Sequence, residues 1–114
     1  MQKPPLQRLW AQCANACDAC ALLCGSVAAD PNATRELSAE QAALLSCAEV
    51  CRLTAKALHE GREGAPHLCT WCADVCETCA NSPRAAAEWA EIAASCRECA
   101  ARCREVAGSP APDF

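Results

Sequence analysis

The side chains of this protein that could carry chemistry are its cysteines. The sequence has 13 of them among 114 residues. A cysteine sulfur binds soft metal ions or pairs with a second sulfur in a disulfide, and the spacing of the cysteines favours one chemistry over the other. The cysteines, all candidate metal ligands, are Cys13, Cys17, Cys20, Cys24, Cys47, Cys51, Cys69, Cys72, Cys76, Cys79, Cys96, Cys99 and Cys103.

The cysteines fall in four short stretches, and within a stretch each follows the previous one by three or four residues. Side chains at these steps lie on one face of an α-helix, so the spacing predicts one cysteine stripe on each of four helices. Such a stripe is the face that a helix buries in a bundle. The stretches read CANACDACALLC, CAEVC, CTWCADVCETC and CRECAARC.

The helices that must position these sulfurs are expected over about residues 5–28, 38–60, 66–80 and 83–107 of a single domain, 1–114. Ser38 with Gln41 reads as a capping box, Gly61 as the end of the second helix, and Ser82 as the cap of the fourth. Short connections predict antiparallel neighbours. The fold class is therefore all-α, an antiparallel up-down-up-down four-helix bundle with a cysteine-lined core.

The bundle is expected to hold a column of sulfur about 15 Å long, at 1.5 Å per residue. One end, called here the Cys24 end, is expected to be closed by apolar side chains from three helices. These are Val27, Leu44, Trp89 and Ile92.

The other end, called here the histidine end, is expected to be free of such a plug. Cys13, Cys69 and Cys103 should lie there, and His59 and His67 come from the adjoining connection. Imidazole is a competent copper ligand, so the two histidines are candidate metal ligands at this mouth. The alternative is that both are ordinary surface histidines.

Charge and composition exclude several classes of function. The net charge is −4 without a basic run, which argues against nucleic acid as a partner. No apolar run reaches the roughly 18 residues of a membrane span. The first residues, MQKPPLQRLW, have no signal-peptide pattern, so we expect a cytoplasmic protein with reduced thiols. No catalytic constellation is recognisable, and the chain is not expected to be an enzyme.

Charge also favours one metal over the others. Thirteen buried thiolates would carry a charge of −13, and burying charge without a partner is costly. Cu(I) is soft and monovalent, so about one ion per cysteine would neutralise the column. Two alternatives stay open: a zinc-binding bundle with tetrahedral sites, and a thiol redox reservoir or sensor. The spacing of neither plant-type nor bacterial ferredoxins is present.

The four stripes resemble those of the bacterial four-helix-bundle copper storage proteins, over about residues 5–107. The resemblance implies a homotetramer of bundles, each storing many Cu(I) ions inside its core. The expected lack of a signal sequence resembles the cytosolic branch of the family. It also implies a histidine or methionine near the open end, which His59 and His67 match. The partners expected of such a store are copper ions and a copper chaperone or a copper-requiring apo-enzyme.

Overall fold

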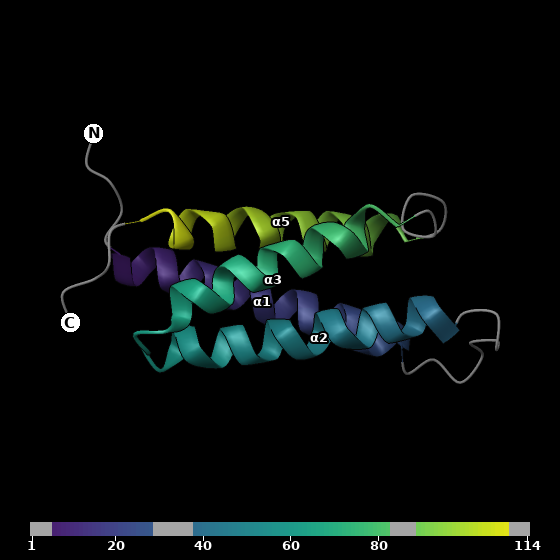
Figure 1. Cartoon of the computed structure of the whole chain (residues 1–114), viewed down its shortest axis with the longest axis horizontal. Coiled ribbons are helices and arrows are strands. Elements are labelled where there is room, and N and C mark those ends of the chain that lie inside the picture. The colour runs from purple at the N-terminus through teal and green to yellow at the C-terminus, as the bar shows by residue number, and fades with distance from the viewer. Residues whose placement is uncertain (1–5, 29–37, 83–88, 110–114) are drawn as a thin grey trace.

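The computed structural model describes residues 6–28, 38–82 and 89–109. Its helices in this part of the chain are α1 (Leu6–Ala28), α2 (Ser38–His59), α3 (Ala65–Ala80) and α5 (Ala90–Ala107), as Figure 1 shows. The same residues contain no strand, and none of the four helices is long and apolar enough to cross a membrane. The predicted all-α class is confirmed.

Glycine ends α2 where the sequence predicts it. Gly61 has φ 65°, a conformation that costs other residues energy. Its N–H donates to the Leu58 carbonyl at 3.2 Å, and the N–H of Arg62 donates to the Ala57 carbonyl at 2.9 Å. This is the Schellman arrangement, which satisfies two carbonyls of the last turn. The chain then turns directly into α3, whose first turn contains Pro66.

The fourth helix begins later in the described residues than its expected range of 83–107. Trp89 has φ −117° and ψ 51°, outside the helical region, and its carbonyl accepts the N–H of Ala93 at 2.8 Å. Local propensity favours helix here, but the half-buried Trp89 packs against the core, and tertiary packing overrides propensity. Pro83 and the rest of 83–88 lie outside the described residues, so the start predicted there is not described.

The connection between α1 and α2, residues 29–37, also lies outside the described residues, and so does the side chain of Ser38, which the predicted capping box requires. Gln41 makes a different contact. Its side-chain amide donates to the carbonyl of Ala28 at 2.9 Å, so it satisfies an acceptor in the last turn of α1. The bond joins the start of α2 to the end of α1.

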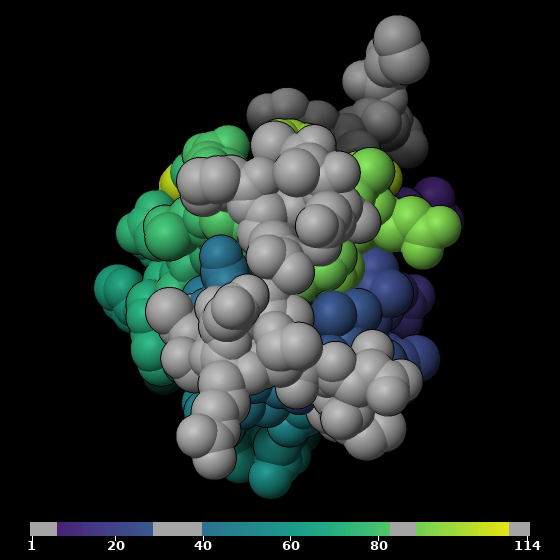
Figure 2. All heavy atoms as spheres, turned by 90° about the vertical axis from the view of Figure 1, so that its right-hand side faces the viewer, coloured from purple at the N-terminus to yellow at the C-terminus, as the bar shows by residue number. Residues whose placement is uncertain are grey.

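The four helices form a ring in chain order, because α1 packs on α2, α2 on α3, α3 on α5, and α5 on α1. Figure 2 views the Cys24 end of the bundle, where the colours of α1, α2, α3 and α5 appear on different sides of the long axis. Sulfur contacts give the directions: Cys13 meets Cys103 while Cys20 meets Cys96. In the same way Cys47 and Cys51 both meet Cys76, and Cys51 also meets Cys72. Residue numbers rise on one helix as they fall on its neighbour, so the paired helices run antiparallel.

Candidate metal centre

A column of sulfur fills the axis of the bundle. All 13 cysteines are free and buried, and 12 of them have no exposed surface, while Cys79 is 5% exposed. Alanines make up much of the rest of the core, and their small side chains leave the axis to the thiols. The stripes predicted from spacing therefore converge as expected.

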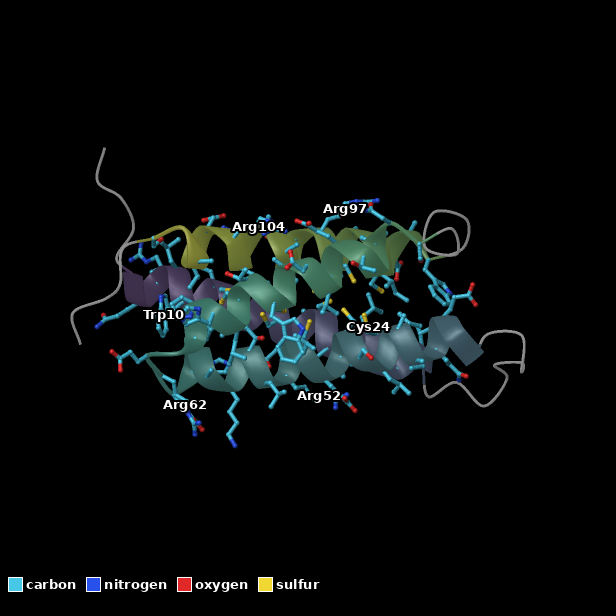
Figure 3. The ribbon with its side chains drawn as sticks, viewed as in Figure 1. Trp10, Cys24, Arg52, Arg62, Arg97 and Arg104 are labelled. Atoms are coloured by element: carbon cyan, nitrogen blue, oxygen red, sulfur yellow. The ribbon has the colours of Figure 1, made fainter. Side chains whose placement is uncertain are left out.

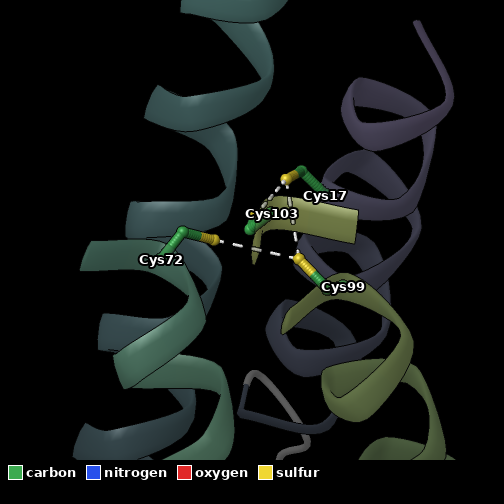
Figure 4. Close-up of side chains that lie close together, drawn as sticks. All are labelled: Cys17, Cys72, Cys99 and Cys103. Atoms are coloured by element: carbon green, nitrogen blue, oxygen red, sulfur yellow. Dashed lines mark hydrogen bonds between the residues drawn. The ribbon is translucent and has the colours of Figure 1, made fainter. Parts of the chain in front are cut away.

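The sulfurs gather in four overlapping groups, within each of which all the Sγ atoms lie within 4.8 Å of one another. Consecutive groups share one cysteine: first Cys103, then Cys99, then Cys20. Figure 4 shows the second group, with dashed contacts that join sulfurs of α1, α3 and α5. From the histidine end, the groups are Cys13/Cys69/Cys103, Cys17/Cys72/Cys99/Cys103, Cys20/Cys51/Cys76/Cys99 and Cys20/Cys24/Cys47/Cys96.

Most of the close sulfur contacts join different helices. The shortest, between Cys99 and Cys17, is 3.5 Å. Contacts along one helix occur at Cys20–Cys24 and Cys72–Cys76, both 3.9 Å. Cysteines four apart on a helix are about 6 Å apart along its axis, whereas facing helices can present sulfurs at the same height. An ion in this column would therefore be held between helices at least as readily as by a pair on one helix.

The thiols share protons through these contacts. The contact between Cys20 and Cys24 lowers the pKa of Cys20 and raises that of Cys24, because one sulfur accepts the hydrogen bond that the other donates. Interactions with Cys103 and then Cys17 lower the pKa of Cys99 to about 6. Contacts with Cys24, then Cys47 and Cys96, lower the pKa of Cys79. Because ligation requires thiolates, metal ions entering this network must displace its protons.

No positive side chain shares the interior in the described part of the chain, where Thr54 is the only buried polar or charged residue. The labelled arginines project from the outside of the bundle in Figure 3. Arg104, for example, pairs with Glu77 at 2.8 Å and with Asp74 at 3.1 Å on the surface. The charge of ionised thiols can therefore be balanced inside the column only by protons or by bound cations.

Thr54 is the core position that the sequence reading left out. It is fully buried, and its Oγ1 donates to the Val50 carbonyl at 2.7 Å. Cys51 of α2 contacts Cys72 of the antiparallel helix α3. Thr54 follows Cys51 by three residues, and Cys69 precedes Cys72 by three, so Thr54 and Cys69 lie at the same height. Thr54 therefore stands at the height of the three-sulfur group, where a fourth thiol would complete a ring. The sequence contains the evidence for this position, because residues 47, 51, 54 and 58 follow one another by three or four and therefore share one face of α2.

Both ends of the column are closed, so the expectation of a plug at the Cys24 end alone is wrong. At the Cys24 end, Leu44 and Ile92 are 1% and 2% exposed. At the histidine end, three side chains one turn beyond the last sulfurs are buried to the same degree, with exposures of 3%, 4% and 1% for Trp10, Leu58 and Val106. Figure 3 shows Trp10 at that end. The stripes of α1, α2 and α5 continue past the cysteines, so the same helical faces that bury sulfur also bury these apolar residues.

The structure does not bring His59 and His67 into any of the sulfur groups of the described residues. Both are exposed. The Nε2 atom of His59 lies 2.9 Å from a carboxylate oxygen of Asp18 on the outer surface of α1. The two histidines therefore lie on the outer surface of the bundle and outside the sulfur column.

Comparisons with known proteins agree with this architecture. The model of the copper storage protein family matches residues 5–108. Among solved structures, the Nmul_A1745 protein from Nitrosospira multiformis is similar, with a TM-score of 0.80 and 27% identity over 88% of this chain and 95% of that chain. A comparison with curated proteins finds no match.

Proposed function

Because the chain belongs to the copper storage protein family, we propose that it stores and buffers Cu(I) inside the bundle at close to one ion per cysteine. All 13 cysteines are the proposed ligands. The observation that carries the proposal is the continuous column of overlapping sulfur groups, in which Cys20, Cys99 and Cys103 each belong to two groups. A store rather than a catalyst is the role that such a buried array supports.

Sharing of sulfurs favours Cu(I) over zinc. A structural zinc site takes four ligands of its own in a tetrahedron. Here consecutive groups share a sulfur, so separate tetrahedral sites would compete for Cys20, Cys99 and Cys103. Cu(I) is soft and binds thiolates at low coordination number, and bridging sulfurs then serve two ions.

Charge balance also favours Cu(I) over zinc. The described interior offers no cationic side chain, so each thiolate needs its counter-charge from a bound ion or a proton. One monovalent ion for each thiolate leaves the column neutral. Fewer divalent ions would leave sulfurs protonated or the sites only partly formed.

Anaerobic titration of the reduced chain with Cu(I) tests the proposal. Saturation is expected near one ion per cysteine, between about 10 and 14 per chain, on the neutralisation argument. Saturation at three or four ions would contradict it and favour tetrahedral, zinc-like sites. Reaction of only one or two cysteine pairs, with formation of disulfides, would favour a redox sensor.

His59 and His67 are proposed as an outer, transient copper site, because both are exposed and come from the end of α2 and the start of α3. Replacing both with phenylalanine should leave the final capacity almost intact. A matching loss of stored copper would show instead that they belong to the store. The measurement is the same titration.

The cellular setting is part of the proposal. We infer a homotetramer in the cytoplasm that exchanges copper with a chaperone or a copper-requiring apo-enzyme, as the resemblance implies. Exposed apolar side chains on the outer faces of α1 and α2, Leu22 at 74% and Leu53 at 53%, support assembly. Light scattering of the purified chain gives the oligomeric state, and a monomer at micromolar concentration would contradict this part.

A further inference from the structure

Stored copper must cross the protein surface, and the two ends of the column are poor routes. Leu44 and Ile92 close one end, and Trp10 with its neighbours closes the other. An ion using either end would have to displace buried apolar side chains, whose burial stabilises the bundle. A route that leaves both plugs in place would avoid this cost.

One sulfur is reachable without moving a plug. Cys79 is 5% exposed, whereas each of the other 12 cysteines has no exposed surface. A hollow of about 380 Å³ lies on the flank of the bundle between α2 and α3, and Cys79 is part of its lining. Trp71 of α3, which is 50% exposed, and Ala43 of α2 also line this hollow. The hollow therefore brings solvent to a sulfur at the side of the column.

Cys79 also faces the column. It lies outside the four sulfur groups, but it continues the stripe of α3 three residues after Cys76, toward the Cys24 end, and it belongs to the same buried core as Cys24, Cys47 and Cys96. Each of these three sulfurs is fully buried. Cys79 is thus the link between the hollow and the nearest storage group.

We propose that Cys79 is the port of the store, the sulfur through which Cu(I) passes between the column and a small thiol complex of Cu(I) seated in the hollow. The inference rests on the proposed function. The occupant follows from size and chemistry, because about 380 Å³ is the volume of a small-ligand pocket rather than of a protein interface. Beside Cys79, the lining combines apolar side chains with polar ones that can hold the polar parts of such a complex: Ala43, Trp71, Val75, Ser46, Asp74 and Thr78.

Transfer at the port is a ligand exchange. The Cys79 sulfur forms a bond to Cu(I) as one bond between copper and the carrier sulfur breaks, and the proton of the Cys79 thiol passes to the released carrier thiolate. Copper remains Cu(I) throughout, and no electron is transferred. Repetition of the exchange with Cys24, Cys47 or Cys96 moves the ion inward and leaves Cys79 ready for the next ion.

Stopped-flow loading of the full reduced chain with a Cu(I)–glutathione complex, without oxygen, tests the port. Cys79→Ser should slow loading, and slow removal by a chromophoric chelator, by about tenfold or more, the usual scale of effect for losing a metal-site partner. Its final capacity should fall by only about one ion. The matched control is Thr70→Ser, a change of similar size at an exposed residue of the same helix that lies outside the hollow and the column, and it should keep the rates of the unaltered chain.

A second pair of variants keeps all 13 cysteines. Ala43→Trp fills the hollow and should slow both rates while leaving the final capacity unchanged. Ala101→Trp adds the same side chain at an exposed position of α5 and should change neither rate nor capacity. Brief alkylation of the copper-free chain, followed by peptide mass spectrometry, should label Cys79 before the other cysteines.

The possible results separate the port from the store. Unchanged rates in both Cys79→Ser and Ala43→Trp would overturn the proposal that Cys79 is the port. So would a slowed rate in a variant with both His59 and His67 replaced by phenylalanine, if Cys79→Ser kept the rate of the unaltered chain. Loading by a Cu(I)-bound CxxC peptide but not by glutathione would overturn the small-thiol occupant. A low capacity in the unaltered chain would refute storage itself, whichever variant is slow.

Discussion

Replacing Thr54 with cysteine should raise the copper capacity of the chain by about one ion. Thr54 is fully buried at the height of the only group with three sulfurs, which contains Cys13, Cys69 and Cys103. A thiol at this position would supply the missing ligand from α2. The other three groups have four sulfurs each.

The cost of this substitution should be small. Cysteine is close to threonine in size, so the core keeps its packing. The substitution removes the hydrogen bond from Oγ1 to the Val50 carbonyl, whose net value is about 1 kcal/mol. That bond runs back four residues along α2, a type that slightly destabilises helices, which reduces the loss further. We expect the free energy of unfolding of the copper-free protein to change by about 1 kcal/mol or less.

The assay is anaerobic Cu(I) titration of Thr54→Cys beside two controls. Thr54→Val removes the hydroxyl without adding a thiol and should keep the capacity of the unaltered chain. Thr70→Cys adds a thiol at an exposed threonine that makes the same kind of bond, to the Pro66 carbonyl at 3.3 Å. With a competing chelator present, an isolated surface thiol should hold no additional copper. Unchanged capacity in a folded Thr54→Cys protein would refute the placement of Thr54 in the three-sulfur ring.

Three further predictions concern the copper-free protein. Far-UV circular dichroism should show a strongly helical spectrum, because both ends of the column have apolar plugs; a coil spectrum would show that metal is required for folding. Stability in urea should fall as pH rises above 9. Contacts with Cys20 raise the pKa of Cys51 and Cys76 above their ordinary value of 9.0, so these thiols stay protonated in the folded protein but ionise in the unfolded chain. A urea midpoint that rises between pH 9 and pH 10 would contradict this. Gly61→Ala should lower the free energy of unfolding by about 1 kcal/mol, since φ 65° is unfavourable for alanine. The control Gly64→Ala, at φ −79°, should cause no loss of stability. Equal effects in the two variants would contradict the role given to the backbone conformation of Gly61.

The sequence by itself determined which residues face the core. Steps of three and four residues fix the face of a helix on which a side chain lies, and this is a property of one helix that needs no knowledge of its neighbours. All 13 cysteines are accordingly buried on the predicted stripes. The end of α2 at Gly61 is also local, because the left-handed conformation there favours glycine.

The tertiary structure decided how the stripes meet. Whether Cys99 lies level with Cys17 depends on how far one helix slides along another, and spacing within a helix does not contain that distance. The sharing of sulfurs between groups, the height of Thr54 and the lateral exposure of Cys79 all follow from this register. The plug at the histidine end was misjudged for the same reason. Trp10, Leu58 and Val106 come from three different helices, and they close the column because packing brings their ends to a common height.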